Sequence, residues 1–197
     1  MEQPQIVLVS PPEVDAAFPD RLAGVLDARA VACVRLALAT RDEGRLTQAA
    51  DAARAVCHAR DVPLVIADQP DLVERLGLDG VHLTDPRGLA RLRKAWGPDP
   101  IIGAWGGTSK HDGMNAGEAG ADYVAFGPVG GAGARVDEDV FAWWSEMIEL
   151  PVIAEGALDR EAVERLAPVA DFLAFGEEVW AGGDPVAALA ALAAPLG

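Results

Sequence analysis

Two aspartates that follow short apolar runs are the residues whose chemistry is most readily interpreted. Asp68 comes two residues after the run at residues 63–66, and Asp85 comes soon after the run at residues 80–82. Mg²⁺ is usually bound by one or two carboxylates together with oxygens of a substrate. Asp68 and Asp85 are therefore candidate metal ligands.

The same two aspartates also have a structural interpretation. Asp85 precedes Pro86, and Asp68 precedes Gln69-Pro70. An aspartate just before a proline at the first helical position is a favourable N-cap. The pattern leaves both roles open for each aspartate.

An arginine and several glutamates lie at the ends of other apolar runs. Arg35 belongs to the run at residues 32–36, Glu155 follows the run at 151–154, and Glu177 follows the run at 172–175. An arginine buried without a partner carries a large desolvation penalty. We therefore predict that Arg35 lies within about 4 Å of one of these carboxylates. His82, at the end of another run, is predicted to be a hydrogen-bonded core histidine.

Eight apolar runs alternate with helical patterns along the chain. The runs are nearly continuous in apolar residues, which is typical of parallel strands covered on both faces; they lie at residues 6–9, 32–36, 63–66, 80–82, 101–104, 123–126, 151–154 and 172–175. The helical patterns lie at residues 20–28, 43–60, 70–76, 86–96, 109–119, 137–147, 159–166 and 185–196, and Ser109 is predicted to cap the fifth.

This alternation predicts an α/β fold, and two architectures fit it: a closed barrel or an open doubly wound sheet. The count of eight favours a single (β/α)₈ TIM barrel over residues 1–197. The turn after the first run is Ser10-Pro11-Pro12, which lacks the glycines of a dinucleotide-binding sheet. In such barrels the active site lies at the carboxyl ends of the strands, where all the charged residues named above would meet.

Composition limits the partners and the compartment. The net charge is −15 at pH 7, from 31 acidic and 16 basic residues, so the surface repels nucleic acid and anionic membranes. Cys33 and Cys57 lack metal-ligand spacing and fit a reducing interior. We see neither an export signal nor a membrane-spanning run, and expect a cytoplasmic protein.

Three segments then resemble the thiamine phosphate synthase/TenI family. They are Asp79-Gly80-Val81-His82-Leu83, Ile101-Ile102-Gly103, and the run from Gly120-Ala121-Asp122-Tyr123 to Gly127-Pro128-Val129. The resemblance covers nearly the whole chain, and its most specific segment is Gly-Ala-Asp-Tyr. It implies a TIM barrel, pairing as a homodimer, and Mg²⁺-dependent joining of an aminopyrimidine pyrophosphate to a thiazole phosphate.

Most of the family's cationic motifs are changed in this chain. The Gln-x-Arg-x-Lys pattern of the second strand, which holds the pyrophosphate in the family, reads Arg35-Leu-Ala37-Leu-Ala39 here. Of the Asn-Asp-Arg after the third strand, Asp68 is kept, and Asp85 is a plausible second Mg²⁺ ligand. The Thr-x-Thr-Lys segment after the sixth strand ends in Arg135. Arg35 and Arg135 are therefore the candidate catalytic residues.

The family's phosphate site between the seventh and eighth strands has become acidic. The resemblance places ligand contacts at Gly127, Glu155, Gly156, Gly176, Glu177 and Glu178. Two like charges about 4 Å apart repel by roughly 4 kcal/mol at an effective dielectric constant of about 20. We therefore predict that these glutamates exclude a phosphate dianion.

Three hypotheses about function follow. The chain is a divergent synthase, with Asp68 and Asp85 binding Mg²⁺ and Arg135 contacting pyrophosphate. Alternatively, it is a non-catalytic or weakly active relative that binds a small molecule. In the third hypothesis the acidic mouth binds a cation, an amine or a metal. The loss of positioned positive charge favours the second.

Overall fold

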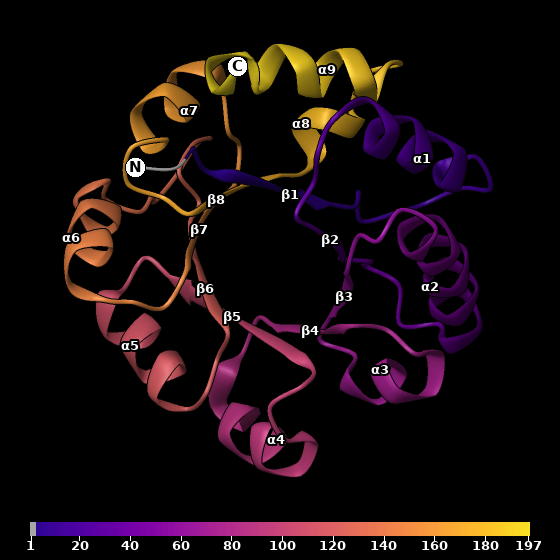
Figure 1. Cartoon of the computed structure of the whole chain (residues 1–197), viewed down its shortest axis with the longest axis horizontal. Helices are drawn as coiled ribbons and strands as arrows, with labels where there is room; N and C mark the ends of the chain where they lie inside the picture. The colour runs from indigo at the N-terminus through magenta and orange to yellow at the C-terminus, as the bar shows by residue number, and fades with distance from the viewer. Residues whose placement is uncertain (1–2) are drawn as a thin grey trace.

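Eight parallel strands form a closed ring at the centre of the molecule (Figure 1), in the computed structural model, which describes residues 3–197. Each strand pairs with the next along the chain, and the last pairs with the first. The strands are β1 (Gln5–Val9), β2 (Cys33–Leu36), β3 (Leu64–Ala67), β4 (Gly80–Leu83), β5 (Ile101–Gly107), β6 (Tyr123–Phe126), β7 (Val152–Glu155) and β8 (Phe172–Phe175). The predicted (β/α)₈ TIM barrel is confirmed.

Helices form an outer layer around this ring (Figure 1). They are α1 (Phe18–Ala28), α2 (Glu43–His58), α3 (Pro70–Leu76), α4 (Leu89–Trp96), α5 (Lys110–Glu118), α6 (Asp139–Met147), α7 (Arg160–Leu166), α8 (Glu177–Trp180) and α9 (Pro185–Leu192), with short 3₁₀ turns at Pro86–Gly88 and Ala194–Leu196. No helix within residues 3–197 is long and apolar enough to cross a membrane.

Side-chain caps begin several of these helices. Asp42, Asp159 and Asp184 each accept a hydrogen bond from a backbone N–H in the first turn of α2, α7 and α9. Ser109 accepts from the Asp112 N–H at the start of α5, as predicted. Such caps satisfy donors that a helix leaves unpaired at its start, and so fix where each helix begins.

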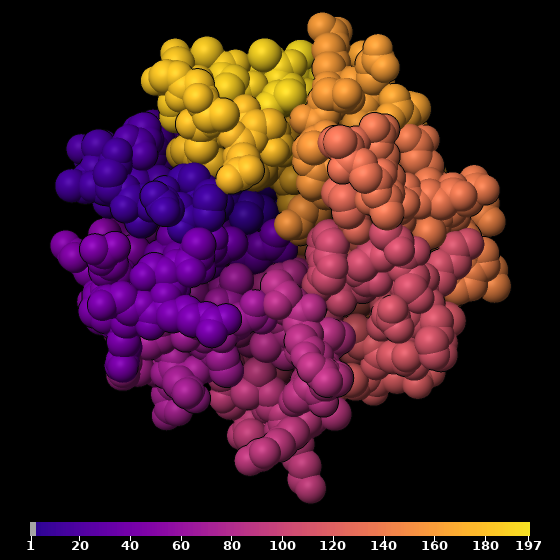
Figure 2. Space-filling model, turned by 180° about the vertical axis from the view of Figure 1, so that it is seen from behind, coloured from indigo at the N-terminus to yellow at the C-terminus, as the bar shows by residue number. Residues whose placement is uncertain are grey.

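The barrel closes where β1 meets β8. Ile6 pairs with Leu173 and Val7 with Ala174 in parallel register. The indigo start and the yellow end of the chain consequently lie side by side on the surface (Figure 2), where α9 packs against α1.

The apolar core has two parts. The larger part lies between the strands and the helices. The smaller part fills the inside of the barrel and consists of Val7, Val9, Ala125, Ile153 and Ala174. Its members are aliphatic and two are alanines, which leaves room inside the ring for longer polar side chains.

Candidate functional site

An ion pair joins two strands at the mouth of the barrel. Arg35 on β2 is 4% exposed, and its Nη2 donates to Oε1 of Glu155 at the end of β7. Burial is the largest single influence and disfavours the charge on Arg35. The charge and hydrogen bond of Glu155, together with Tyr123 and Cys33, outweigh burial, so the pKa of the guanidinium is raised. The predicted partnership of Arg35 with one of the glutamates is confirmed.

A histidine and a tyrosine add a second polar contact to the barrel. His82 on β4 is buried, and its Nδ1 lies 3.1 Å from the hydroxyl oxygen of Tyr123 on β6. The two rings are stacked with centroids 5.7 Å apart. Burial, and then the charge of Arg35, lower the pKa of His82 well below its usual range, so the imidazole is neutral at pH 7. The predicted core histidine is confirmed.

Tyr123 is the residue that sequence analysis missed. Its ring lies against Gly103 on β5, where an added Cβ would overlap the aromatic atoms. Tyr123 is the single tyrosine of the sequence, and it lies two residues before the inward-facing Ala125. Because side chains alternate between the two faces of a strand, this spacing was the signal that Tyr123 also points inward.

Parts of the ion pair remain unsatisfied within the described chain. Arg35 Nε, Arg35 Nη1 and Glu155 Oε2 have no hydrogen-bond partner among residues 3–197. A buried polar atom without a partner is unfavourable by about 1–3 kcal/mol. The pair therefore carries a cost that its Coulomb attraction must offset.

Beyond β8, a glutamate carboxylate accepts a hydrogen bond from a backbone N–H group. Glu178 Oε1 accepts a hydrogen bond from the Gly176 N–H at 3.0 Å. Burial raises the pKa of Glu178, and the nearby Glu155 charge acts in the same direction. The adjacent Glu177 is exposed. The short helix α8 that follows is held by Trp180, whose Nε1 donates to the Val9 carbonyl oxygen at 2.6 Å.

The glycines of the predicted ligand site have packing roles in the structure. Gly127 is buried, and a Cβ there would overlap the carbonyl oxygen of Glu155. Gly156 has a φ of 95°, and its carbonyl oxygen accepts from the Gly130 N–H at 3.0 Å. The segment after β6 is thus bound closely to the segment after β7.

Asp68, which follows β3, bonds to the segment that follows β4 instead of capping a helix. Its carboxylate accepts from the backbone N–H of Thr84 at 2.8 Å and from the Thr84 hydroxyl at 2.6 Å. The residue before α3 is Gln69, which makes no side-chain cap. The capping interpretation of Asp68 is therefore wrong, because its carboxylate is bonded to Thr84, the residue that follows β4. The φ of Asp68 is positive, at 54°.

Asp85 has the capping role, one of the two roles that the sequence left open. It accepts from the Arg87 N–H at 3.2 Å and starts the 3₁₀ turn at Pro86–Gly88. It also pairs with the Arg87 side chain, whose Nε lies 2.8 Å from Asp85 Oδ1. The hydrogen bonds from Arg87 lower the pKa of Asp85 to about 2.

The donor set at these two positions does not fit a divalent cation as arranged. The Asp68 carboxylate is hydrogen-bonded by Thr84, and the Asp85 carboxylate is neutralised by Arg87. Over the part of the chain that the structure describes, no three His, Cys, Asp or Glu side chains converge on one point.

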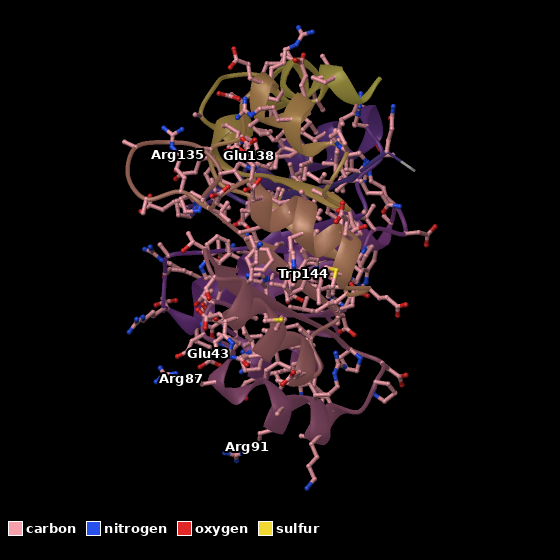
Figure 3. The ribbon with its side chains drawn as sticks, turned by 90° about the vertical axis from the view of Figure 1, so that its left-hand side faces the viewer. Glu43, Arg87, Arg91, Arg135, Glu138 and Trp144 are labelled. Atoms are coloured by element: carbon pink, nitrogen blue, oxygen red, sulfur yellow. The ribbon has the colours of Figure 1, made fainter. Side chains whose placement is uncertain are left out.

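Arg135 lies on a loop that projects from the body of the molecule (Figure 3). The loop, residues 130–135, is mostly exposed and contains Gly131 and Gly133 at positive φ. Arg135 is exposed and belongs to no ion pair among residues 3–197. The structure thus separates Arg135 from the buried pair formed by Arg35 and Glu155.

These features define the class of small (β/α)₈ barrels whose polar side chains gather at the carboxyl ends of the strands. A sequence model described as thiamine monophosphate synthase matches residues 6–179. The chain belongs to the thiamine monophosphate synthase family.

Two relatives and one solved structure illustrate the similarity. The chain is 39% identical to the thiamine-phosphate synthase of Rhodospirillum centenum, covering 89% of each protein. It is 36% identical to the thiamine-phosphate synthase of Erythrobacter litoralis, covering 93% of this chain and 91% of that one. Thiamine phosphate pyrophosphorylase from Pyrococcus furiosus superposes on this chain with a TM-score of 0.85 at 19% identity. The superposition covers 98% of this chain and 95% of that one, which establishes a shared fold.

Proposed function

We propose that this chain is a non-catalytic or weakly active member of its family that retains the barrel and binds a small molecule. One observation carries the proposal: the buried guanidinium at the mouth is neutralised by Glu155. The resemblance places the pyrophosphate-binding cations at positions 37 and 39, which are alanines here. Arg35 cannot replace them, because its charge is already paired.

The amide beyond β8 supports the same proposal. A phosphate group at a barrel mouth is usually bound by backbone N–H groups near the last two strands. The Gly176 N–H donates to Glu178 instead. A phosphorylated substrate would have to displace a carboxylate and then lie beside it.

Mg²⁺ is the cofactor that the family resemblance implies, and it would supply positive charge to a pyrophosphate leaving group. Asp68 and Asp85 would be its ligands, but the hydrogen bonds from Thr84 and the ion pair with Arg87 oppose this. We assign no step of the reaction to the metal in this chain.

A synthase assay tests the proposal. The chain is incubated with the aminopyrimidine pyrophosphate, the thiazole phosphate and Mg²⁺, beside the Rhodospirillum centenum relative. Removal of one positioned charge-stabilising donor typically lowers kcat by about 10²–10³, so we expect turnover at least about 1,000-fold slower than that of the relative. Titration calorimetry of each substrate measures binding separately.

The second candidate function is an active synthase, which the family match over residues 6–179 favours. Turnover comparable to that of the relative would establish it and refute our proposal. The third hypothesis, an acidic receptor for a cation or amine, loses support because Arg35 already neutralises Glu155.

The expected compartment is the cytoplasm. Cys33 and Cys57 are both free thiols, and burial raises the pKa of each to about 12. Cys57 is buried and Cys33 is partly buried. Protonated thiols react slowly, which is compatible with a reducing compartment and supports no disulfide role. Pairing as a homodimer remains part of the proposal through the resemblance alone.

A further inference from the structure

A cavity of about 700 Å³ lies beside the barrel mouth, between α1, α2 and the loops that precede these two helices. Its volume falls within the range typical of small-molecule sites. None of the residues discussed above as mouth residues lines it, apart from Ala39. The cavity is therefore a separate feature from the ion pair.

The apolar side of the cavity is lined by Phe18 and Leu38 and by two alanines of α2, Ala49 and Ala52. The small alanine side chains on α2 leave the space open. Phe18 is almost fully buried, and its ring packs against that of Trp180 with the two ring centroids 5.3 Å apart. The position of Phe18 is therefore fixed.

Hydrogen bonds hold the two loops that frame the cavity. The Ala39 N–H donates to the Pro12 carbonyl oxygen at 2.9 Å. The Ser10 hydroxyl oxygen accepts from the Ala37 N–H at 2.9 Å. Because the walls are joined to each other, the cavity is formed before any ligand binds.

The polar rim of the cavity is electrically asymmetric. Arg45 on α2 is the basic residue of the lining, and it is in no ion pair within residues 3–197. The loop before α1 contributes two carboxylates to the rim, Glu13 and Asp15. Asp15 is already engaged by Arg21 at 3.0 Å and by the Ala17 N–H at 3.0 Å, whereas Glu13 is in no ion pair within residues 3–197. The rim formed by α2 thus offers an available cation, and Gln48, which also lines the cavity, can donate a further hydrogen bond.

We propose that this cavity binds a small amphipathic anion. Its aromatic or aliphatic body would pack against Phe18, Leu38 and Ala49, and its carboxylate or sulfonate would contact Arg45. Binding at the cavity is independent of catalysis at the barrel mouth, because the two sites share no charged residue.

Two dyes of similar size test the cavity and its charge preference. One is 1-anilinonaphthalene-8-sulfonate, an aromatic anion, and the other is N-phenyl-1-naphthylamine, which has a similar body without the sulfonate. Fluorescence titration at about 0.15 M salt, where long-range fields are screened beyond about 8 Å, gives each Kd. We expect the anion to bind at one site per chain and more tightly than the neutral dye, although the net charge of −15 opposes it.

Three variants locate the binding. Ala49→Phe fills the cavity and should weaken binding of the anionic dye at least tenfold. Ala52→Leu is a second variant that obstructs the cavity less. Arg45→Gln should weaken the anion about threefold to fivefold, which is the size of an exposed charge contact, and should leave the neutral dye unchanged. Arg91→Gln removes an exposed arginine on α4 (Figure 3) and is the control, with no expected effect.

Each alternative result is decisive. Anionic dye that binds Ala49→Phe and Ala52→Leu as tightly as the native chain would show that the cavity is not the site. Equal affinity of the native chain for both dyes, or an equal loss in Arg45→Gln and Arg91→Gln, would refute the role of Arg45. Thermal unfolding of every variant checks that the barrel remains folded.

Discussion

At the mouth of the barrel, the charges of Arg35 and Glu155 depend on each other. Removing one partner of a buried pair leaves the other charge unpaired, which costs more than the pair itself contributes. Arg35→Met should therefore lower the free energy of unfolding by about 3 kcal/mol, measured by urea denaturation. Glu155 is 19% exposed, so water reduces this cost below that of a fully buried charge.

The double variant Arg35→Met with Glu155→Leu provides the control. Replacing both charges by apolar side chains removes the unsatisfied atoms as well as the attraction. We expect it to recover most of the stability that Arg35→Met loses. A double variant less stable than the single one would contradict this interpretation of the pair.

His82 makes the stability of the barrel depend on pH. Its pKa is lowered in the folded chain, so the unfolded chain takes up a proton that the folded chain does not. The free energy of unfolding should therefore fall as pH drops below about 6.5, with a limiting slope of about 1.4 kcal/mol per pH unit. Urea denaturation between about pH 7 and 5 measures it. His82→Asn should show a shallower slope, and an identical slope would rule out His82 as its source.

Glu178 makes the stability of the barrel depend on pH in the opposite direction to His82. Burial raises its pKa, so the folded chain holds this proton more tightly, and its contribution to stability decreases as pH rises through the folded-state pKa. Glu178→Gln keeps an oxygen acceptor for the Gly176 N–H without the charge. We expect it to be more stable than the native chain at pH 7 and to lose this advantage at low pH. The matched control is Glu177→Gln, at an exposed position, which should change little in thermal unfolding.

At the scale of elements, the contact between β5 and β6 requires a residue without a side chain, Gly103, on β5. A Cβ at Gly103 would overlap the Tyr123 ring, so Gly103→Ala must displace Tyr123 and its contact with His82. Overpacking of this kind typically costs about 1–3 kcal/mol, measurable by chemical denaturation. Gly88→Ala, where the added Cβ meets no atom within 4 Å, should stay within about 0.5 kcal/mol of the native chain. Equal effects at the two glycines would contradict the steric explanation.

Most strands and helices could be predicted because their signals are local. Continuous apolar runs marked all eight strands, and capping residues such as Ser109 and Asp85 marked helix starts. The helix α8 was missed because it has four residues, Glu177–Trp180, which is too short for a hydrophobic period. Its position depends on the contact between Trp180 and Val9, residues far apart in sequence.

The candidate site was predictable where charge balance required a partner. Burial of Arg35 demanded a carboxylate, and Glu155 supplies it. The role of Asp68 could not be predicted, since its partner Thr84 follows the neighbouring strand β4 and is 16 residues away in sequence. The cavity between α1 and α2 gave no sequence signal, because its walls come from two separate loops and two helices.

At the scale of the whole molecule, the excess of acidic residues should make stability depend on salt. With a net charge of −15, repulsion opposes the compact state, and exposed ion pairs compensate weakly. Raising NaCl from about 0.02 M to 0.5 M shortens the Debye length to a few ångströms, so the urea midpoint should rise. A midpoint that falls with NaCl would indicate that ion pairs dominate over repulsion.

The pairing of β1 with β8 has a consequence for biosynthesis. During synthesis on the ribosome, β1 emerges before β8. The edge of β1 that pairs with β8 stays uncovered until β8 has been synthesised. Contacts between distant parts of a sequence form slowly, and an uncovered strand edge is a template for association with other chains. The nascent chain is therefore prone to associate with other chains until β8 is released. Molecular chaperones that cover exposed strand edges would act during this interval.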